Sequence, residues 1–393
     1  MSLTTRVLVG LVAGFLVGLV ARPAAIAVVA PLGTIFVNLI RMTVFPLVVS
    51  MLIASIGSMA NSRALGRVGA RAIGIAVVLL AIAAVASVAI AAPVLSRVHI
   101  DRAAVQTAAS AAPARDSPIA KWFVDLVPSN VVRAMDEDAM LPVIVFTVLF
   151  ALALTRVREE RRTAVLSIVD GIAEVVQTLV VWILETAPIG VFALAVPLAA
   201  RLGVAMAGAV AVYIVLVVSL TVTAALLLLY PLGIIGGQMR PSAFASFCAP
   251  AQAVAFSSRS SLASLPAMLE SVERAGSPPV IAGFIVPLAA SVFRFGAAIA
   301  QTVGVLFLAH LYDIALSPAQ LASIVVTVVF TTFAVPGIPG GSVLAMVPVL
   351  HAANVPVDGI GILLAVDTIP DMFRTTANVT GSMALAAVLA KRA

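Results

Sequence analysis

The last apolar stretch of the sequence, residues 359–390, carries a row of polar side chains. They follow one another at intervals of four, three, four and four residues, which places them on one face of an α-helix. They are Asp367, Asp371, Arg374, Asn378 and Ser382, with Thr375 beside the row. Burying such groups in an apolar environment is costly unless partners or a ligand compensate. The row therefore predicts either a binding site or an internal Asp–Arg pair that fixes helix packing.

The donor and acceptor types of this row indicate what it would bind. The planar guanidinium of Arg374 suits a carboxylate, which it can hold through two hydrogen bonds. Asp371, one turn away, suits an ammonium group, and Asn378 can both donate and accept. A ligand that carries carboxylates and an amino group fits this set better than a sugar or an inorganic cation.

Two other apolar runs, residues 241–270 and 318–350, are interrupted at their centres. Serines around Arg259 interrupt the first, and several Pro and Gly residues between 334 and 342 interrupt the second. We expect each run to be a re-entrant hairpin, two half-helices that meet inside the bilayer, rather than a kinked structural helix. A charged helix follows each hairpin, which is typical of inverted repeats around a site at the membrane midplane.

Each hairpin tip suggests residues that would face this site. Ser260 and Ser261, with the amides of a half-helix N-terminus, suit an anionic group, although serines there can also simply cap the half-helices. Pro339 and Gly340 would let the second tip approach a ligand and act as a gate, or they form a rigid turn.

Composition identifies the environment of these elements. Of 393 residues, 62% are hydrophobic and only 10% are charged, which excludes a large water-exposed surface. We therefore expect an all-α membrane protein with eight spanning helices and two hairpins. The first run is interpreted as a retained helix rather than a signal peptide. The expected spans are residues 7–21, 31–59 (kinked near Pro46), 70–93, 141–155, 165–200, 204–235, 280–311 and 359–390.

The charge of +6 comes mainly from arginines in short loops, which indicates a cytoplasmic face rather than binding of nucleic acid. This places both termini in the cytoplasm and the polar segment around residues 101–121 outside. The single cysteine, Cys248, and three scattered histidines predict no multi-cysteine or histidine metal site and no cofactor.

Several segments resemble the glutamate/aspartate transporter family, the dicarboxylate/amino acid:cation symporters. The likeness keeps the order of elements along nearly the whole chain. The segments are 65–69 (LGRVG), 187–193 (APIGVFA), 258–266 (SRSSLASLP), 335–341 (VPGIPGG) and 367–381 (DTIPDMFRTTANVTG).

The resemblance implies a homotrimer of elevator-type transporters in the cell (inner) membrane. Residues 1–69 and 96–202 would form the scaffold, and residues 70–95 and 203–393 the moving transport domain. By family role, Arg374 would hold a substrate side-chain carboxylate and Asp371 the amino group. Thr375, Asn378 and Ser261 would hold the main-chain groups. Relatives specific for dicarboxylates lack the aspartate and neutral amino acid relatives lack the arginine, so the pair implies an acidic amino acid.

The chain also departs from the family pattern. The family's sodium-ligating motif in the seventh span reads FRFGA here, residues 293–297, and Ser382 replaces a sodium-ligating aspartate. Leu79 and Leu80 stand where the third span carries hydroxyl groups. Phenylalanine and leucine offer no oxygen to sodium, so at least two family sodium sites should be missing. A sodium site built from backbone carbonyls at the second hairpin stays open.

Arg294 adds a fixed positive charge within that altered motif. We expect its guanidinium to replace the electrostatic effect of sodium by pairing with Asp371, Asp367 or the substrate. The alternatives are an arginine that reaches water, or one that stabilises an inactive paralogue. Gln301 stands where proton-coupled relatives carry a glutamate, and the sequence leaves proton-coupled and uncoupled transport open.

Three other functions compete with this prediction. An intramembrane hydrolase would use Ser260 with Asp371, but no histidine or lysine is positioned as a base, and two gating tips would have no obvious use in it. The second class is an ion channel or a binding protein that does not transport, and a channel would give conductance without saturable, counterflow-type exchange. Within transporters, the alternative is a C4-dicarboxylate carrier in which Arg294 neutralises Asp371.

Overall fold

The computed structural model describes most of the chain, and the described part contains helices but no strand. The described residues are 3–20, 23–57, 63–97, 124, 127–137, 139–202, 205–279, 281–335 and 340–391.

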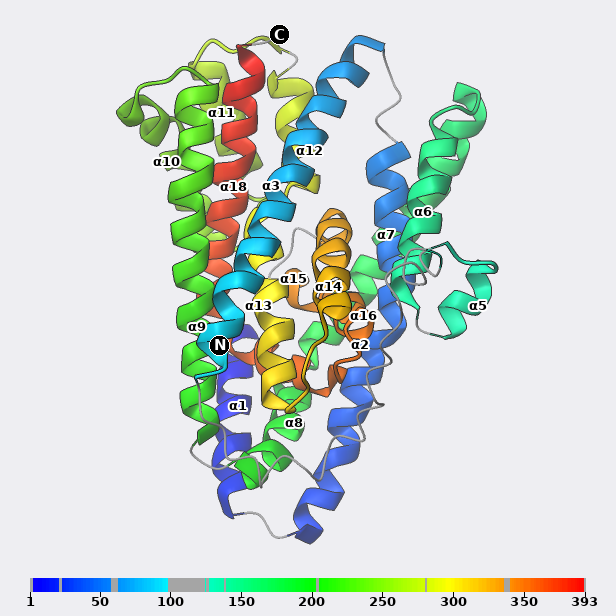
Figure 1. The fold of residues 1–393 in the computed structure, drawn as a ribbon, viewed down its shortest axis with the longest axis vertical. Coiled ribbons are helices and arrows are strands. Elements are labelled where there is room, and N and C mark those ends of the chain that lie inside the picture. Colours follow the sequence, from blue (N-terminus) through cyan, green and yellow to red (C-terminus); the bar gives the residue numbers. More distant parts are fainter. Residues whose placement is uncertain are drawn as a thin grey trace.

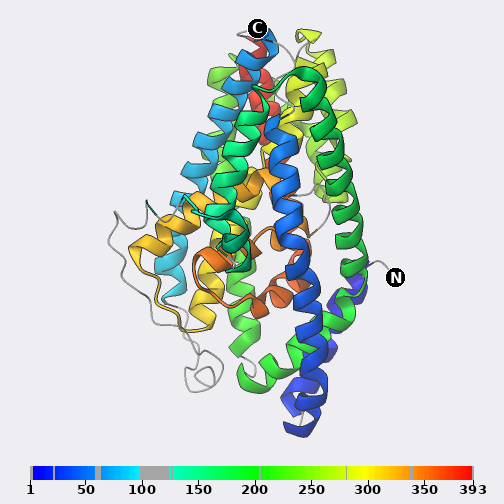
Figure 2. The ribbon, with the colours of Figure 1, turned by 90° about the vertical axis from the view of Figure 1, so that its right-hand side faces the viewer.

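Long helices lie roughly along one axis of an elongated molecule (Figures 1 and 2). The described helices of the first half are α1 (Leu3–Val20), α2 (Pro23–Gly57), α3 (Arg63–Leu95), α5 (Val131–Asp136), α6 (Met140–Leu154), α7 (Glu159–Glu185) and α8 (Ala187–Leu202). Those of the second half are α9 (Ala205–Ala224), η3 (Ala225–Leu229), η4 (Leu232–Gly236), α10 (Pro241–Ser258), α11 (Leu265–Arg274), η5 (Ile281–Ile285), α12 (Val286–Val292), α13 (Phe295–Leu311), α14 (Pro318–Thr331), η6 (Thr332–Ala334), α15 (Gly341–Leu344), α16 (Val347–Ala352), η7 (Val357–Gly359), α17 (Ile360–Val366) and α18 (Thr368–Ala390).

Five stretches within the described residues are long and apolar enough to cross a bilayer. They are Ala25–Ala54, Val68–Leu95, Glu159–Glu185, Gly208–Gly236 and Ile281–Leu311. Shorter apolar helices, including α1, α6 and α8, accompany them. This is the composition of a multi-pass membrane protein.

The helices pack in two groups. In the first, α1 and α2 pack on α8, and α2 also contacts α6 and α7. In the second, α13 packs on α3, α9 and α18, and α10 packs on α18. Contacts of α17 with α8 and of α2 with η6 join the groups.

A stripe of glycines on α1 permits the closest packing of the first group. A Cβ atom at Gly10, Gly14 or Gly18 would lie 2.3–2.6 Å from a backbone oxygen of α8. Such small residues at every fourth position let two membrane helices approach closely. This contact was not predicted from the sequence.

Two expectations about helix continuity were wrong. The span expected over 165–200 is divided at Thr186 into α7 and α8, and Pro188 provides no N–H for the carbonyl of Leu184. The break expected near Pro46 is also absent, since α2 continues through this proline. The seventh span expected over 280–311 coincides with the candidate span Ile281–Leu311, within which α12 ends at Val292 and α13 begins at Phe295.

Two helices occupy the run of the first predicted hairpin. Helices α10 and α11 pack on each other, and the chain turns between them at Arg259, whose φ of 55° is left-handed. The second is formed by α14 and η6 on one arm and by α15 and α16 on the other. Its tip residues, 336–339, lie outside the described residues.

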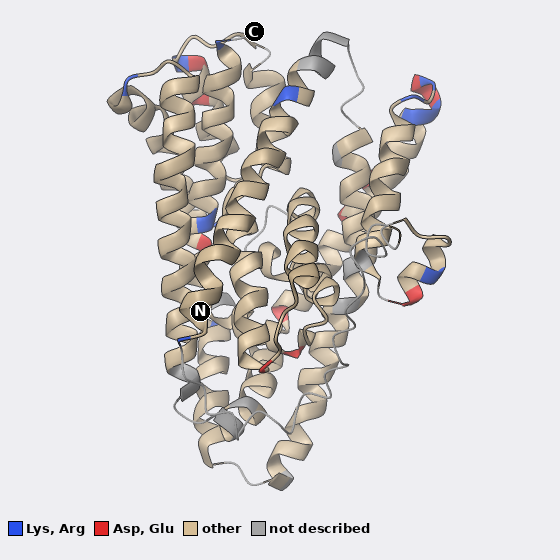
Figure 3. Cartoon of the chain, viewed as in Figure 1, with Lys and Arg blue, Asp and Glu red and all other residues tan. Residues whose placement is uncertain are grey.

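Basic residues gather toward the end of the molecule that carries the C-terminus (Figure 3). The start of α3 and the turn between α6 and α7 lie at this end (Figure 1). The N-terminus lies nearer the middle of the long axis (Figure 1).

Candidate functional site

A buried ion cluster lies at the start of α18. Nη2 of Arg374 is 2.7 Å from Oδ2 of Asp367 and 2.8 Å from Oδ1 of Asp371. The arginine is 0% exposed, and the two aspartates are 4% and 5% exposed. Helical spacing explains the arrangement, because residues three and seven positions apart lie on the same face of α17 and α18.

The remaining nitrogens of Arg374 are less well satisfied. Nε and Nη1 are buried, and neither has a hydrogen-bond partner among the described residues. Oδ1 of Asp367 is also buried and has no hydrogen-bond partner among the described residues. Buried polar atoms are normally hydrogen-bonded, so an unsatisfied set around one arginine indicates a site for a polar ligand.

The interrupted helix α12–α13 packs directly against this cluster. A Cβ atom on Gly296 would lie 2.6 Å from both Cα and the carbonyl oxygen of Arg374, so only glycine permits this approach. The N–H of Gly296 donates to Oδ1 of Asn378 at 2.7 Å. The amide oxygen of Asn378 thus faces the backbone of α13, and its NH₂ group is a donor that it can offer to a ligand.

Arg294 is the last residue before α13 and is 3% exposed. Asp371 is the carboxylate with which it interacts electrostatically. Among the described residues no carboxylate oxygen lies within 4.0 Å of its guanidinium, and its Nε has no hydrogen-bond partner. The expected approach to Asp371 therefore takes the form of a longer-range attraction, not a direct ion pair.

The first hairpin reaches the start of α18 through Arg259. Its Nη1 donates to Oγ1 of Thr368 at 3.4 Å, and its charge interacts with Asp367. Oγ of Ser260 accepts the N–H of Ala263 at 3.2 Å within the turn that joins α10 to α11. Ser261 is buried.

The second hairpin also reaches the cluster. The N–H of Gly340, whose φ is 79°, donates to Oδ2 of Asp371 at 3.4 Å. Thr375 donates from Oγ1 to Oδ1 of the same aspartate at 3.5 Å. Pro339 lies outside the described residues. Arg374, Thr375 and Gly340 therefore all approach Asp371.

Gln301 holds the two arms of this hairpin together. Its Nε2 donates to the carbonyl of Ser342 on α15 at 3.3 Å, and its Oε1 accepts from Oγ1 of Thr331 on α14 at 2.9 Å. Gln301 therefore supports the hairpin from α13.

The positions at which this chain departs from the family motif are packed with apolar atoms. Leu79 and Leu80 are buried in the same apolar core as Phe293. The ring of Phe293 covers Gly381, where a Cβ atom would lie 2.4 Å from it. The hydroxyl of Ser382 donates to the carbonyl of Asn378 in its own helix.

Tyr213 of α9 was not predicted to belong to the site. It is 0% exposed, its hydroxyl has no hydrogen-bond partner among the described residues, and it interacts electrostatically with Asp367, Asp371 and Arg374. The only signal in the sequence is a tyrosine within a mainly apolar stretch.

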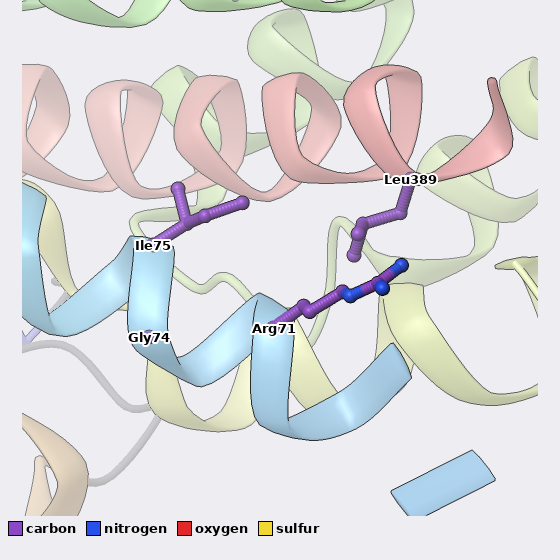
Figure 4. A pocket seen from close by; sticks show the side chains of 4 residues that line it. All are labelled: Arg71, Gly74, Ile75 and Leu389. Carbon is purple, nitrogen blue, oxygen red and sulfur yellow. The ribbon is translucent and has the colours of Figure 1, made fainter. Parts of the chain in front are cut away.

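A separate open pocket lies between α3 and the end of α18 (Figure 4). Arg71, Gly74, Ile75 and Leu389 line it, and none of the predicted site residues is among them.

Comparison with known proteins identifies the family. A family model described as the sodium:dicarboxylate symporter family matches residues 3–392. The chain belongs to this family. The predicted family is thereby confirmed, and the protein is a multi-pass membrane transport protein, not an enzyme.

Curated relatives match over almost the whole chain. The proton/glutamate-aspartate symporter of Escherichia coli (strain K12) is 29% identical over 99% of this chain and 92% of the relative. The proton/sodium-glutamate symport protein of Bacillus subtilis (strain 168) is 30% identical, with the same coverage. The C4-dicarboxylate transport protein of Rhodospirillum rubrum is 27% identical over 99% of this chain and 88% of the relative.

Proposed function

We propose that this protein carries an acidic amino acid, aspartate or glutamate, across the membrane without sodium. The observation that carries the proposal is Arg374, which is fully buried, shares one nitrogen between two carboxylates, and has two nitrogens without a partner among the described residues. A substrate carboxylate would complete its hydrogen bonds. The names of the relatives that act on glutamate and aspartate support this substrate class.

Each neighbouring group has a proposed role that follows from the donors and acceptors it carries. Asp371 would receive the substrate ammonium, and Thr375 lies beside it. Asn378 would donate to the main-chain carboxylate, since its oxygen is already bonded to Gly296. Ser260, Ser261, Pro339 and Gly340 would line the site from the hairpin tips, with Arg259, Asp367 and Gln301 in support.

The alternative substrate is a C4-dicarboxylate, which the name of the Rhodospirillum rubrum relative favours. Charge argues against it. Three arginines, Arg259, Arg294 and Arg374, adjoin two aspartates. An acidic amino acid carries one net negative charge and would neutralise this site, whereas a dicarboxylate would leave a negative charge in excess unless a proton accompanied it.

Sodium independence is proposed because apolar side chains occupy positions that supply oxygen ligands in the family. Phe293, Leu79 and Leu80 offer no ligand to a hard cation. In this proposal Arg294 supplies the positive charge that sodium would otherwise bring.

The larger assembly is proposed by analogy with the family. The first helix group, within residues 1–69 and 96–202, would be the scaffold of a homotrimer in the inner membrane. The second, within residues 70–95 and 203–393, would move as the elevator and carry the site. The basic residues near the C-terminal end support a cytoplasmic location for that end, and the N-terminus is proposed to share it.

The test is uptake of radiolabelled aspartate by liposomes that contain the purified protein. We expect saturable uptake of equal rate in sodium, potassium and choline chloride, and weaker competition by succinate than by glutamate. Repeating the measurement with and without an imposed pH gradient reports proton coupling. Uptake that rises with sodium concentration contradicts the sodium proposal, and stronger competition by succinate contradicts the substrate proposal.

A further inference from the structure

Arg294 stands apart from the other two arginines of the site. Arg374 is paired with two carboxylates, and Arg259 lies on a half-buried hairpin tip. Arg294 is 3% exposed, and no described carboxylate oxygen lies within 4.0 Å of it. The residues between Val335 and Gly340 that lie outside the described part are Pro, Gly, Ile and Pro, which carry no carboxylate. The carboxylate that attracts it electrostatically, Asp371, is already bonded to Arg374.

The charge of the site therefore depends on whether an anion is bound. Without a ligand, three guanidinium groups adjoin two carboxylates and one positive charge is in excess. An acidic amino acid, with two carboxylates and one ammonium group, brings one net negative charge. The loaded site is then neutral, and the empty site is positive.

This difference in net charge affects the step in which the empty site moves back across the membrane to bind the next substrate. Alternating exposure of the site to the two sides requires that its charge crosses the apolar part of the bilayer, and uncompensated charge there is costly. A bound metal ion leaves with the substrate and takes its charge with it. The guanidinium of Arg294 is covalently attached and cannot leave, so it disfavours return of the empty site at every turnover.

We propose that the protein is an exchanger of acidic amino acids. The site crosses the membrane readily only when it is loaded, so one acidic amino acid enters for each one that leaves. Both carry one net negative charge, and a complete exchange therefore moves no net charge. This proposal rests on the proposed function and adds the mode in which that function operates.

The test compares entry of radiolabelled aspartate into two kinds of sodium-free liposomes that contain the full-length protein. One kind is preloaded with unlabelled aspartate, and the other contains chloride alone. Potassium and a potassium ionophore set the membrane potential to zero, and in a second series make it inside-positive, which favours entry of an anion. We expect aspartate to enter preloaded liposomes at least about tenfold faster than chloride liposomes. This ratio corresponds to a barrier for return of the empty site that is ~1.4 kcal/mol higher than the barrier for return of the loaded site.

The outcomes separate this proposal from the one on which it rests. Two results would overturn exchange and leave aspartate transport intact. The first is that aspartate enters chloride liposomes as fast as preloaded ones. The second is that an inside-positive potential raises the rate of entry into chloride liposomes to the rate seen with preloaded ones. No entry in either kind of liposome would overturn the proposed substrate, and exchange with it. These results come from the unaltered protein, so they do not depend on the folding of a variant.

A matched pair of variants then tests Arg294 itself. Arg294→Met removes the fixed charge, and we expect the ratio of preloaded to chloride entry to fall several-fold because the empty site returns more easily. Arg274→Met removes a charge on α11 that is exposed and paired with Glu270, and we expect the wild-type ratio. A ratio that stays high in Arg294→Met would overturn the assignment to this arginine.

Discussion

At the scale of single residues, one nitrogen of Arg374 holds both Asp367 and Asp371. The two aspartates are equally buried but differ in their other contacts. Asp371 also accepts from the N–H of Gly340 at the second hairpin, whereas Oδ1 of Asp367 has no partner among the described residues. They are therefore suited to different tasks, although each contributes one ion pair to the arginine.

This difference leads to a prediction about substrate choice. In Asp371→Asn the proposed partner of the substrate ammonium is lost, and aspartate should bind about 10–100-fold more weakly, as expected for a charged hydrogen bond worth ~1.5–3 kcal/mol. Succinate has no ammonium group, so its affinity should change less. A binding titration of both ligands to the purified variant measures the ratio.

Asp367→Asn is the matched control, because it also removes one ion pair of Arg374. It should alter the binding of aspartate and succinate by similar factors. If the two variants changed the preference equally, Asp371 would have no special role toward the amino group. Arg374→Ala is a poorer probe, since removal of one partner of a buried ion pair costs about 3–5 kcal/mol of stability.

At the scale of elements, the contact of α13 with α18 fixes the relation of Arg294 to Arg374. Gly296 lies against the backbone of Arg374 and donates to Asn378. The atoms that a Cβ would meet are backbone atoms, which cannot rotate away as a side chain can. Helices α13 and α18 can therefore come this close only because Gly296 has no Cβ atom.

Gly296→Ala should therefore separate α13 from α18. Overpacked contacts of this kind cost about 1–3 kcal/mol, and we expect both a lower apparent melting temperature and loss of aspartate binding. Gly283→Ala is the control, since a Cβ atom there meets nothing within 4 Å. Thermal unfolding in detergent, with and without aspartate, measures both effects. Wild-type behaviour of Gly296→Ala would show that the close approach is not required.

The elements that the sequence predicts well are those with a local signal. The serines around Arg259 break the helical pattern where α10 ends, and the row from Asp367 to Ser382 has helical spacing that α18 preserves. The break at Phe293 and Arg294 lacks such a signal, because both residues are compatible with an apolar or a buried helix.

Proline shows why local rules also fail. Pro46 lies inside the continuous helix α2, whereas Pro188 lies just after the division between α7 and α8. Neighbouring helices decide which carbonyl groups are satisfied, and their positions are not encoded within a few residues. Tyr213 was missed for the same reason, since it interacts with residues more than 150 positions away in the sequence.

At the scale of the whole molecule, the second helix group carries the ion cluster and the first contacts it mainly through α8 and α2. The cluster has its own positive charges, so its stability should not depend on a dissociable cation. A ligand that binds only the folded protein stabilises it by about 2.7 kcal/mol at a hundred times its dissociation constant. A sodium-binding transporter is therefore expected to unfold at a higher temperature in sodium than in potassium.

This protein should show no such difference. We expect the same apparent melting temperature in sodium chloride, potassium chloride and choline chloride of equal ionic strength, at one heating rate. Aspartate should raise the melting temperature in all three salts, which establishes that the protein is competent to bind and that the assay detects a ligand. A rise that only sodium produces, or stabilisation by aspartate that requires sodium, would mean that oxygen ligands outside the Phe293 region still form a cation site. Arg294 would then supplement bound sodium rather than replace it, and the case for exchange would weaken because part of the positive charge could leave the site.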